Sequence, residues 1–288
     1  MSVRHFWLRN AVGSTIDLMS RRLFLYKPTG LGYTRSMTFQ RVAEGFFATS
    51  LNRLGQSAMA GEIVFAGSDP YSEYAELMDW IATAGSLQLG YSPSGDSENT
   101  FWAAAQIDAV AKAERTVGSG VLRVPVSVML TGLWSRITPI VAEIAPTASP
   151  LTYPQTYPRV YGTAIAGSYS FTAGGHEPAA FGVVCAGALT NPVLSLIRDD
   201  TSTTIGVMAL TATVASGATL VYSSVPLSDG VWVQSSAGTL TDRVASLDLT
   251  KNNFFRAPVG IPCTITLSAD DTISTTAMLS IYEFFVSV

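Results

Sequence analysis

Residues 61–91 contain the clearest helical pattern in the chain, and a short strand is predicted on either side of it. The β-branched and aromatic residues of Glu62–Phe65 predict the first strand, and Leu87–Leu89 predicts the second. Elsewhere the apolar segments are short and separated by turn residues, which is typical of β-strands. Any fold for this chain must therefore place one helix within a β-rich domain.

The predicted helix has recognisable ends. Asp69 is the expected N-cap, and Pro70 stands at the first helical position, where its missing N–H costs nothing. Gly85 is the expected C-cap glycine. Apolar residues at helical spacing predict one buried face. They are Tyr71, Tyr74, Ala75, Met78, Ile81 and Ala82.

The rest of the first half is predicted to be β-structure. Val3–Leu8 and Arg22–Tyr26 are expected strands, whereas 37–60 predicts one or two strands with a long loop. Thr100–Val110 and Val121–Leu130 are long enough to form a hairpin with an extended connection.

A cluster of prolines separates the two halves of the chain. Five X-Pro pairs occur between Thr138 and Pro158, and each biases the preceding residue toward an extended conformation. We therefore predict a first domain at 1–135, a Pro-rich linker at 136–158 and a second domain at 159–288.

The second domain is predicted to be an antiparallel β-sandwich, because short strands recur there between turn residues. The expected strands are Ser168–Phe171, Ala180–Ala186, Val193–Ile197, Ile205–Leu210, Thr219–Val225, Val231–Gln234, Ala245–Leu249, Cys263–Leu267 and Met278–Val286.

Charge and composition exclude several classes of partner. The net charge of −4 gives no basic face for nucleic acid, and no apolar run reaches the length of a membrane span. The first residues lack the apolar core of a signal peptide, so synthesis in a cytoplasm is expected. Charged residues make up only 13% of the chain, which suits a subunit covered by partners but equally an ordinary sandwich.

Candidate catalytic and metal-binding residues are sparse. His5 and His176 fall in different predicted domains, so a histidine-centred triad would have to cross the linker. The pairs Asp199–Asp200 and Asp270–Asp271 lie in predicted turns, where a solvated role is favoured over glycosidase chemistry. Asp96 and Glu98 lack the ligand spacing of a calcium loop. No catalytic, cofactor or metal site is predicted.

Three other features have structural interpretations. Cys185 and Cys263 lie in apolar strands and are expected to be buried free thiols. The Gly30–Gly32 segment is expected to be a turn rather than a phosphate loop. Four aromatic residues could stack on sugars, although packing in the sandwich or linker is favoured. They are Tyr153, Tyr157, Tyr161 and Trp232.

The order of short motifs along nearly the whole chain resembles that of the siphophage distal tail (Dit) proteins. In the first half the motifs are Trp7–Asn10 with Gly13, Gly30–Gly32, Gly61–Phe65, Tyr71–Tyr74, Leu87, Leu89, Tyr91, Pro93, Lys112–Glu114 and Trp134. In the second half they are Tyr153–Pro154, Tyr157–Pro158, Tyr161–Gly162, Gly187, Asn191–Pro192, Asn253–Phe255 and Pro258–Gly260.

The resemblance implies a structural subunit of the phage tail tip. Its N-terminal domain would be tail-tube-like and form a hexameric ring, and its C-terminal domain would be a galectin-like sandwich. The implied partners are further copies of the chain, the tail tube protein, the tail-associated hub or lysin protein, and a receptor-binding protein or host cell-wall glycan. No residue is implied to be catalytic.

Two alternatives of other classes stay open from the sequence. A carbohydrate-binding module is the main one, although the polar residue set that galectins use is missing, and His176 and Arg198 are too isolated to restore it. A cell-wall hydrolase is the less favoured one.

Overall fold

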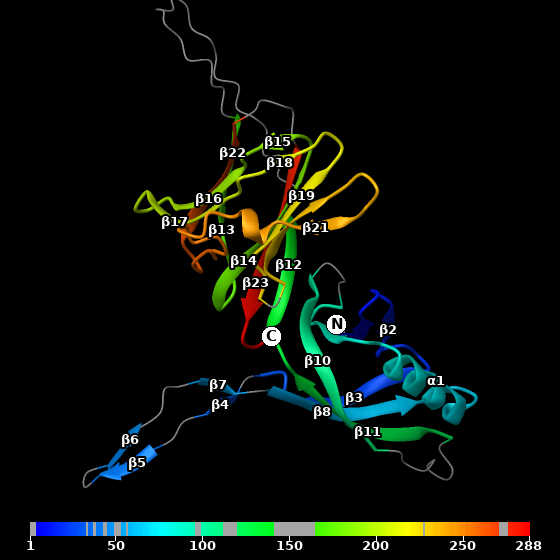
Figure 1. Ribbon diagram of the computed structural model, residues 1–288. Coiled ribbons are helices and arrows are strands. Elements are labelled where there is room, and N and C mark those ends of the chain that lie inside the picture. The colour runs from blue at the N-terminus through cyan, green and yellow to red at the C-terminus, as the bar shows by residue number, and fades with distance from the viewer. Residues whose placement is uncertain are drawn as a thin grey trace, which may run out of the picture. The chain divides into compact units, whose positions relative to one another are not determined.

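The structure is a computed structural model that describes residues 4–32, 34–36, 39–42, 45–48, 53–55, 57–95, 99–111, 120–140, 165–226, 228–270 and 276–288 (Figure 1). Within these residues the protein is mainly β with one α-helix, as predicted. The chain divides into two compact units. The first comprises Met1–Arg136 and Phe285–Val288, and the second comprises Ile137–Phe284.

The first unit is built on antiparallel strands in the order β2-β1-β9-β10, continued through β11, β8 and β3. The main elements are β1 (His5–Asn10), β2 (Thr15–Asp17), β3 (Leu23–Thr29), β8 (Ser57–Phe65), α1 (Pro70–Ala82), β9 (Leu87–Ser92), β10 (Phe101–Val110) and β11 (Leu122–Leu130). β12 (Trp134–Ile140) begins in this unit and continues into the second from Ile137. β10 pairs with β9 through its first half and with β11 through its second half, so the predicted hairpin of β10 and β11 is confirmed.

The segment after β2 connects the two ends of this strand order. The Leu18 N–H donates to the Phe6 carbonyl of β1 at 2.9 Å, and the Leu25 N–H of β3 donates to the Leu18 carbonyl at 2.7 Å. The strands thus curve round a core of buried side chains. These include Phe6, Leu8, Phe65, Leu77, Leu89, Leu122, Val124 and Trp134.

The helix begins as predicted but ends earlier. The Asp69 side chain accepts from the Ser72 N–H at 3.3 Å, and Pro70 opens the helix. The C-cap is Thr83, whose hydroxyl donates to the Asp79 carbonyl at 2.9 Å, so the prediction of Gly85 as the cap is wrong. The hydroxyl satisfies a terminal carbonyl of the helix locally, and Gly85 makes the turn that follows, with φ of +70°.

The buried face of α1 also differs from the prediction. Leu77 is the buried residue at its centre, and Tyr74, Met78 and Ile81 pack beside it. Tyr71, which is 38% exposed, points to solvent together with Ala75 and Ala82. The apolar spacing correctly predicted an amphipathic helix. It did not predict correctly which residues form the buried face.

Between β3 and β8 the chain forms two further strand pairs instead of the predicted long loop. β4 (Thr34–Ser36) pairs with β7 (Arg53–Gly55), and β5 (Phe39–Val42) pairs with β6 (Gly45–Ala48). The Gly30–Gly32 segment precedes them and contains a bend at Gly32. Gly30 has φ of +85°, and a Cβ there would lie 2.0 Å from the Ala58 carbonyl oxygen, so only glycine fits.

The second unit contains two antiparallel sheets that face a common core. One has the order β23-β14-β19-β20-β21 and the other β13-β22-β16-β17, with a small β15-β18 pair. The elements are β13 (Ile165–Thr172), β14 (Glu177–Ala186), β15 (Leu189–Thr190), β16 (Val193–Arg198), β17 (Thr203–Ala209), β18 (Thr213–Val214), β19 (Thr219–Ser223), β20 (Gly230–Gln234), β21 (Leu240–Asp242), η2 (Val244–Ser246), β22 (Pro262–Ala269) and β23 (Thr276–Phe285).

Most predicted strands of the second unit are present, but Ala245–Leu249 is not a strand. The 3-10 helix η2 occupies its start, because the Ser246 and Leu247 N–H groups bond locally to the carbonyls of Arg243 and Val244. The galectin-like form of the sandwich stays a prediction.

The predicted linker lies largely outside the described residues. Residues 136–140, including Thr138–Pro139, belong to β12, whereas 141–158 are not among the residues that the structure describes. The domain limits at 135 and 159 therefore stay predictions.

Candidate assembly surface

The outer face of the first unit carries a row of aromatic residues across three strands. Phe6 and Leu8 of β1 point into the core, so Trp7 and Arg9 point outward. Trp7 lies opposite Gly90 of β9, and Gly90 lies opposite Trp102 of β10. Glycine is needed between the indoles, because a Cβ on Gly90 would lie 2.7 Å from the Trp102 ring.

Cationic and polar groups cover these indoles. The Arg9 guanidinium lies 3.9 Å from the centroid of the Trp102 ring, and its Nε donates to the Gln88 side-chain oxygen at 2.8 Å. Its Nη2 donates to the same oxygen. Burial lowers the pKa of the Arg9 guanidinium from its ordinary value. The ring of His5 stacks on Trp7, with centroids 4.4 Å apart. We call these four residues, His5, Trp7, Arg9 and Trp102, the outer column.

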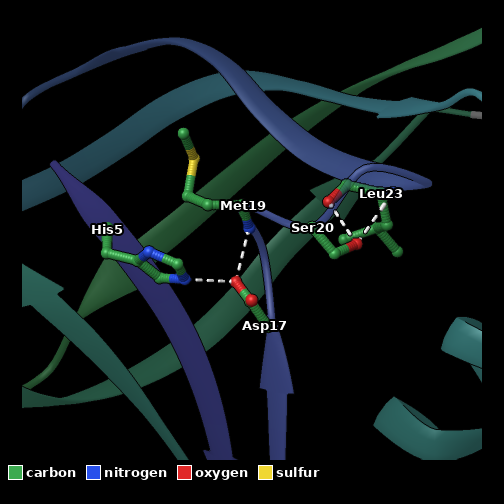
Figure 2. A network of polar contacts seen from close by, with 5 residues as sticks. All are labelled: His5, Asp17, Met19, Ser20 and Leu23. Carbon is green, nitrogen blue, oxygen red and sulfur yellow. Dashed lines mark hydrogen bonds and ion pairs between the residues drawn. The ribbon is translucent and has the colours of Figure 1, made fainter. Parts of the chain in front are cut away.

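A polar network holds one end of the outer column (Figure 2). His5 Nε2 lies 2.5 Å from Asp17 Oδ1, and the same oxygen accepts from the Met19 N–H at 2.7 Å. The Ser20 hydroxyl donates to the Leu23 carbonyl at 3.0 Å and accepts from the Leu23 N–H at 3.1 Å. The network fixes the segment that joins β2 to β3, and with it the position of His5.

A cavity of about 380 Å³ lies between α1 and the segment containing β2 and the start of β3. It is lined by Ile16, Arg22, Leu23, Glu73, Glu76, Leu77 and Trp80. The Glu73 Oε2 is buried there and has no hydrogen-bond partner within the described residues. The cavity combines apolar walls with groups of both charges.

One long strand has an open edge. β9 pairs with residues 101–105 of β10 only, and β11 occupies the other side of the strand from Ala105 to Val110. Within the described residues, no strand pairs with 106–110 on the β9 side. Gln106, Asp108 and Ala109 are exposed there. Unpaired backbone groups of this kind can accept a strand from another chain.

The residues singled out as catalytic candidates do not converge. His5 belongs to the outer column of the first unit, and the His176 N–H of the second unit donates to the Phe284 carbonyl at 2.7 Å. Asp199 and Asp200 lie in the exposed turn after β16, as predicted. Arg198 binds Asp200 through Nε and Nη2 at 3.0 and 2.7 Å, and this hydrogen bonding lowers the pKa of Asp200.

The remaining acidic candidates also lack a site. Asp270 accepts from the Asn191 side-chain amide at 2.7 Å on the surface. Asp271, Asp96 and Glu98 lie outside the described residues. Among the residues that are described, no three His, Cys, Asp or Glu side chains come together as metal ligands.

Cys185 and Cys263 are buried free thiols, as predicted. Burial raises the pKa of Cys185 to about 12 and also raises the pKa of Cys263. Both side chains therefore stay protonated and serve as small apolar groups in the sandwich core.

The expectation that Trp232 packs in the sandwich core is wrong. Val231 is buried and Val233 packs against the core, so Trp232 points to the outer face of the sheet. Its indole lies over Gly230, where a Cβ would be 2.4 Å from the ring. Tyr153, Tyr157 and Tyr161 lie outside the described residues.

Sequence reasoning did not single out Trp102, Gln88 or Asp17. The alternation of side chains along β10 could have indicated Trp102, because it lies on the face of the strand opposite to the buried Ala103 and Ala105. Its pairing with Trp7 across Gly90 needs the strand register, which alternation within one segment does not supply. No helix in the described residues is long and apolar enough to cross a membrane.

Comparison with known proteins gives a consistent result. The family model described as "Distal tail protein, N-terminal domain" matches residues 5–131. A chain of the phage P2 baseplate in its activated conformation with Ca has the same fold, with a TM-score of 0.67 at 12% identity over 99% of this chain and 100% of that one. The SPP1 Dit protein, described as a paradigm of hub adsorption apparatus in phages that infect Gram-positive hosts, gives a TM-score of 0.56 at 8% identity over 96% and 98%. No curated protein sequence matches.

Proposed function

We propose that the chain is a structural subunit of a bacteriophage tail tip, because residues 5–131 match the model of the N-terminal domain of distal tail proteins. The observation that carries this proposal is the family match over the unit that holds the outer column and the open edge of β10. The similarity of fold to baseplate and Dit chains over nearly their whole length supports it.

We infer that six copies form a closed ring. A ring requires a heterologous interface, in which one surface of each copy meets a different surface of the next. The open edge of β10 at 106–110 supports strand addition as one half of that interface. In this arrangement the β10–β11 hairpin extends the ring, and α1 braces its outside.

The ring would join the tail tube to the host-adsorption apparatus. The proposed partners are the tail tube protein on one side and the tail-associated hub or lysin protein on the other. The second unit would face a receptor-binding protein or host cell-wall glycan. The role is architectural rather than catalytic, and the protein would be assembled in the bacterial cytoplasm and reside in the virion.

Native mass spectrometry and negative-stain imaging of the full chain test the ring. We expect a six-chain species and a six-fold ring, with or without added tube protein. A strict monomer at every concentration, also with tube protein present, would contradict the proposal.

A variant of the open edge tests the interface. Gln106→Glu with Ala109→Glu places two charges beside Asp108, and burying them in an interface is costly. We expect the ring to dissociate while the melting temperature changes little, because both residues are exposed. Thr201→Glu, in the exposed turn after β16, is the matched control and should leave the ring intact.

A further inference from the structure

The outer face of the larger sheet in the second unit carries two partly exposed aromatic rings, those of Trp232 and Tyr282. Register places Ser280, Gly182, Ser223 and Gly230 side by side across β23, β14, β19 and β20. The sequence neighbours of this row, such as Phe181 and Tyr222, have side chains buried in the core. Because side chains alternate along a strand, the row itself faces outward.

Each glycine of this row lies beneath an aromatic ring. A Cβ on Gly230 would lie 2.4 Å from the Trp232 indole, and a Cβ on Gly182 would lie 3.3 Å from the Tyr282 ring. Gly182 and Gly230 are two strands apart, which corresponds to about 10 Å across the sheet. Ser223 lies between them, and its hydroxyl oxygen accepts from the Val225 N–H at 3.2 Å, whereas its own proton has no acceptor within the described residues.

Charge and ring contacts indicate what this face can bind. No charged residue occurs in 182–186, 219–223, 230–234 or 278–282, and one carboxylate, that of Asp242 on the edge strand β21, lies opposite Trp232. This surface suits an uncharged ligand that carries hydrogen-bond donors. Within the described residues, no aromatic or cationic group lies on Trp232 or Tyr282, in contrast to the indoles of the outer column. Aromatic rings with an apolar face and hydroxyl groups between them match the alternating C–H and O–H groups of a sugar chain.

We propose that this face binds a neutral linear glycan, with Trp232 and Tyr282 each contacting a sugar ring and Ser223 bonding to the segment between them. The spacing of the two aromatic residues requires at least two sugar rings. This inference concerns the second unit alone and does not depend on ring formation by the first.

Two larger apolar residues lie in the same cross-strand row as Trp232, on the strands farthest from it. Met278 and Val184 are opposite each other and are 48% and 40% exposed. A protein partner would draw its affinity from these side chains by apolar burial. A glycan contacting the two aromatic rings would depend on them far less, so these two residues provide the control.

The test is an array of neutral oligosaccharides of two to eight rings probed with the full chain, followed by calorimetry with the best hit. We expect binding that requires two or more rings. Trp232→Ala and Tyr282→Ala should each weaken it about fivefold, since an aromatic contact contributes on the order of 1 kcal/mol. Trp232→Phe should retain most of the affinity, and Val184→Ser with Met278→Ser should leave it unchanged.

Absence of binding to every oligosaccharide would overturn the proposal. So would binding that survives both aromatic substitutions, or binding that is lost only in the Val184→Ser, Met278→Ser variant. Thermal melting and native mass measured on each variant separate loss of the glycan site from loss of folding or of the ring.

Discussion

The outer faces of the two units share one local arrangement, but they differ in whether another side chain covers the aromatic ring. In each, an indole lies over a strand glycine: Trp102 over Gly90 in the first unit and Trp232 over Gly230 in the second. In the first unit, Arg9 covers the Trp102 ring. In the second, no such group lies on Trp232 within the described residues. We therefore assign the covered ring a structural role, whereas the ring without such a cover belongs to the proposed glycan site.

The largest expected effect is that of Gly90→Ala. The new Cβ would lie 2.7 Å from the Trp102 ring, which cannot move outward without leaving Arg9 and shifting against Trp7. We expect a loss of about 2 kcal/mol in the free energy of unfolding of the first unit, within the range for overpacking. Chemical denaturation followed by hydrogen exchange would locate the loss. An unchanged stability would show that the outer column is loosely packed.

Removing the cation from the outer column should have a smaller effect. Arg9→Met keeps the length of the side chain but removes the cation–π contact and both hydrogen bonds to Gln88. We expect about 1 kcal/mol of destabilisation, measured by the same denaturation. Arg9→Lys, which keeps the charge but loses the planar group, should fall in between. Equal stability of all three proteins would contradict the role assigned to Arg9.

Gly230→Ala is the matched substitution in the second unit, and it should have little effect on stability. The Cβ would lie closer to the ring than in Gly90→Ala, at 2.4 Å, but within the described residues no aromatic or cationic group stacks on this indole, so we expect it to shift more easily. Replacing a strand glycine with alanine also recovers about 0.5 kcal/mol of backbone entropy. We expect a net change below about 0.5 kcal/mol by denaturation. A loss as large as that of Gly90→Ala would show that Trp232 is held as firmly as Trp102.

The smallest expected effect concerns an arginine of the second unit that pairs with a carboxylate rather than a ring. Arg198 lowers the pKa of Asp200, so the stabilisation is present above the ordinary pKa of an aspartate and is lost as pH falls through the lowered value. Arg198→Gln should move the pKa of Asp200 back toward its ordinary value in an NMR titration of the carboxyl carbon. The pair is exposed, so the effect on stability should be slight. If the pKa of Asp200 did not change, Arg198 would not be the cause of its lowered value.

Local signals in the sequence predicted local structure well. Asp69 and Pro70 identified the helix start because the N-cap bond and the first helical position depend on adjacent residues. The helix end was mispredicted because the Thr83 hydroxyl takes the role expected of Gly85. The buried face was misplaced because it depends on which strands α1 packs against, and Leu77 rather than Tyr71 meets them.

The candidate surfaces could not be predicted in this way, because they depend on register between distant strands. Trp7 and Trp102 meet only across Gly90 of a third strand. Trp232 was expected in the core because aromatic residues usually pack there, whereas its parity within β20 turns it outward. Val231 and Val233 alternate with Trp232, so they must lie on the opposite face of the strand. The sequence alone did not show which of the two faces packs against the core.

The second unit is inserted within the chain of the first. Phe285 packs edge-on against Phe101 at 5.1 Å, and Val288 packs against the core of the first unit. During synthesis, the first unit therefore cannot complete its core until residue 288 has left the ribosome, well after the strands of the second unit have emerged. An unfinished chain would therefore lack part of the core of the unit that we propose forms the ring.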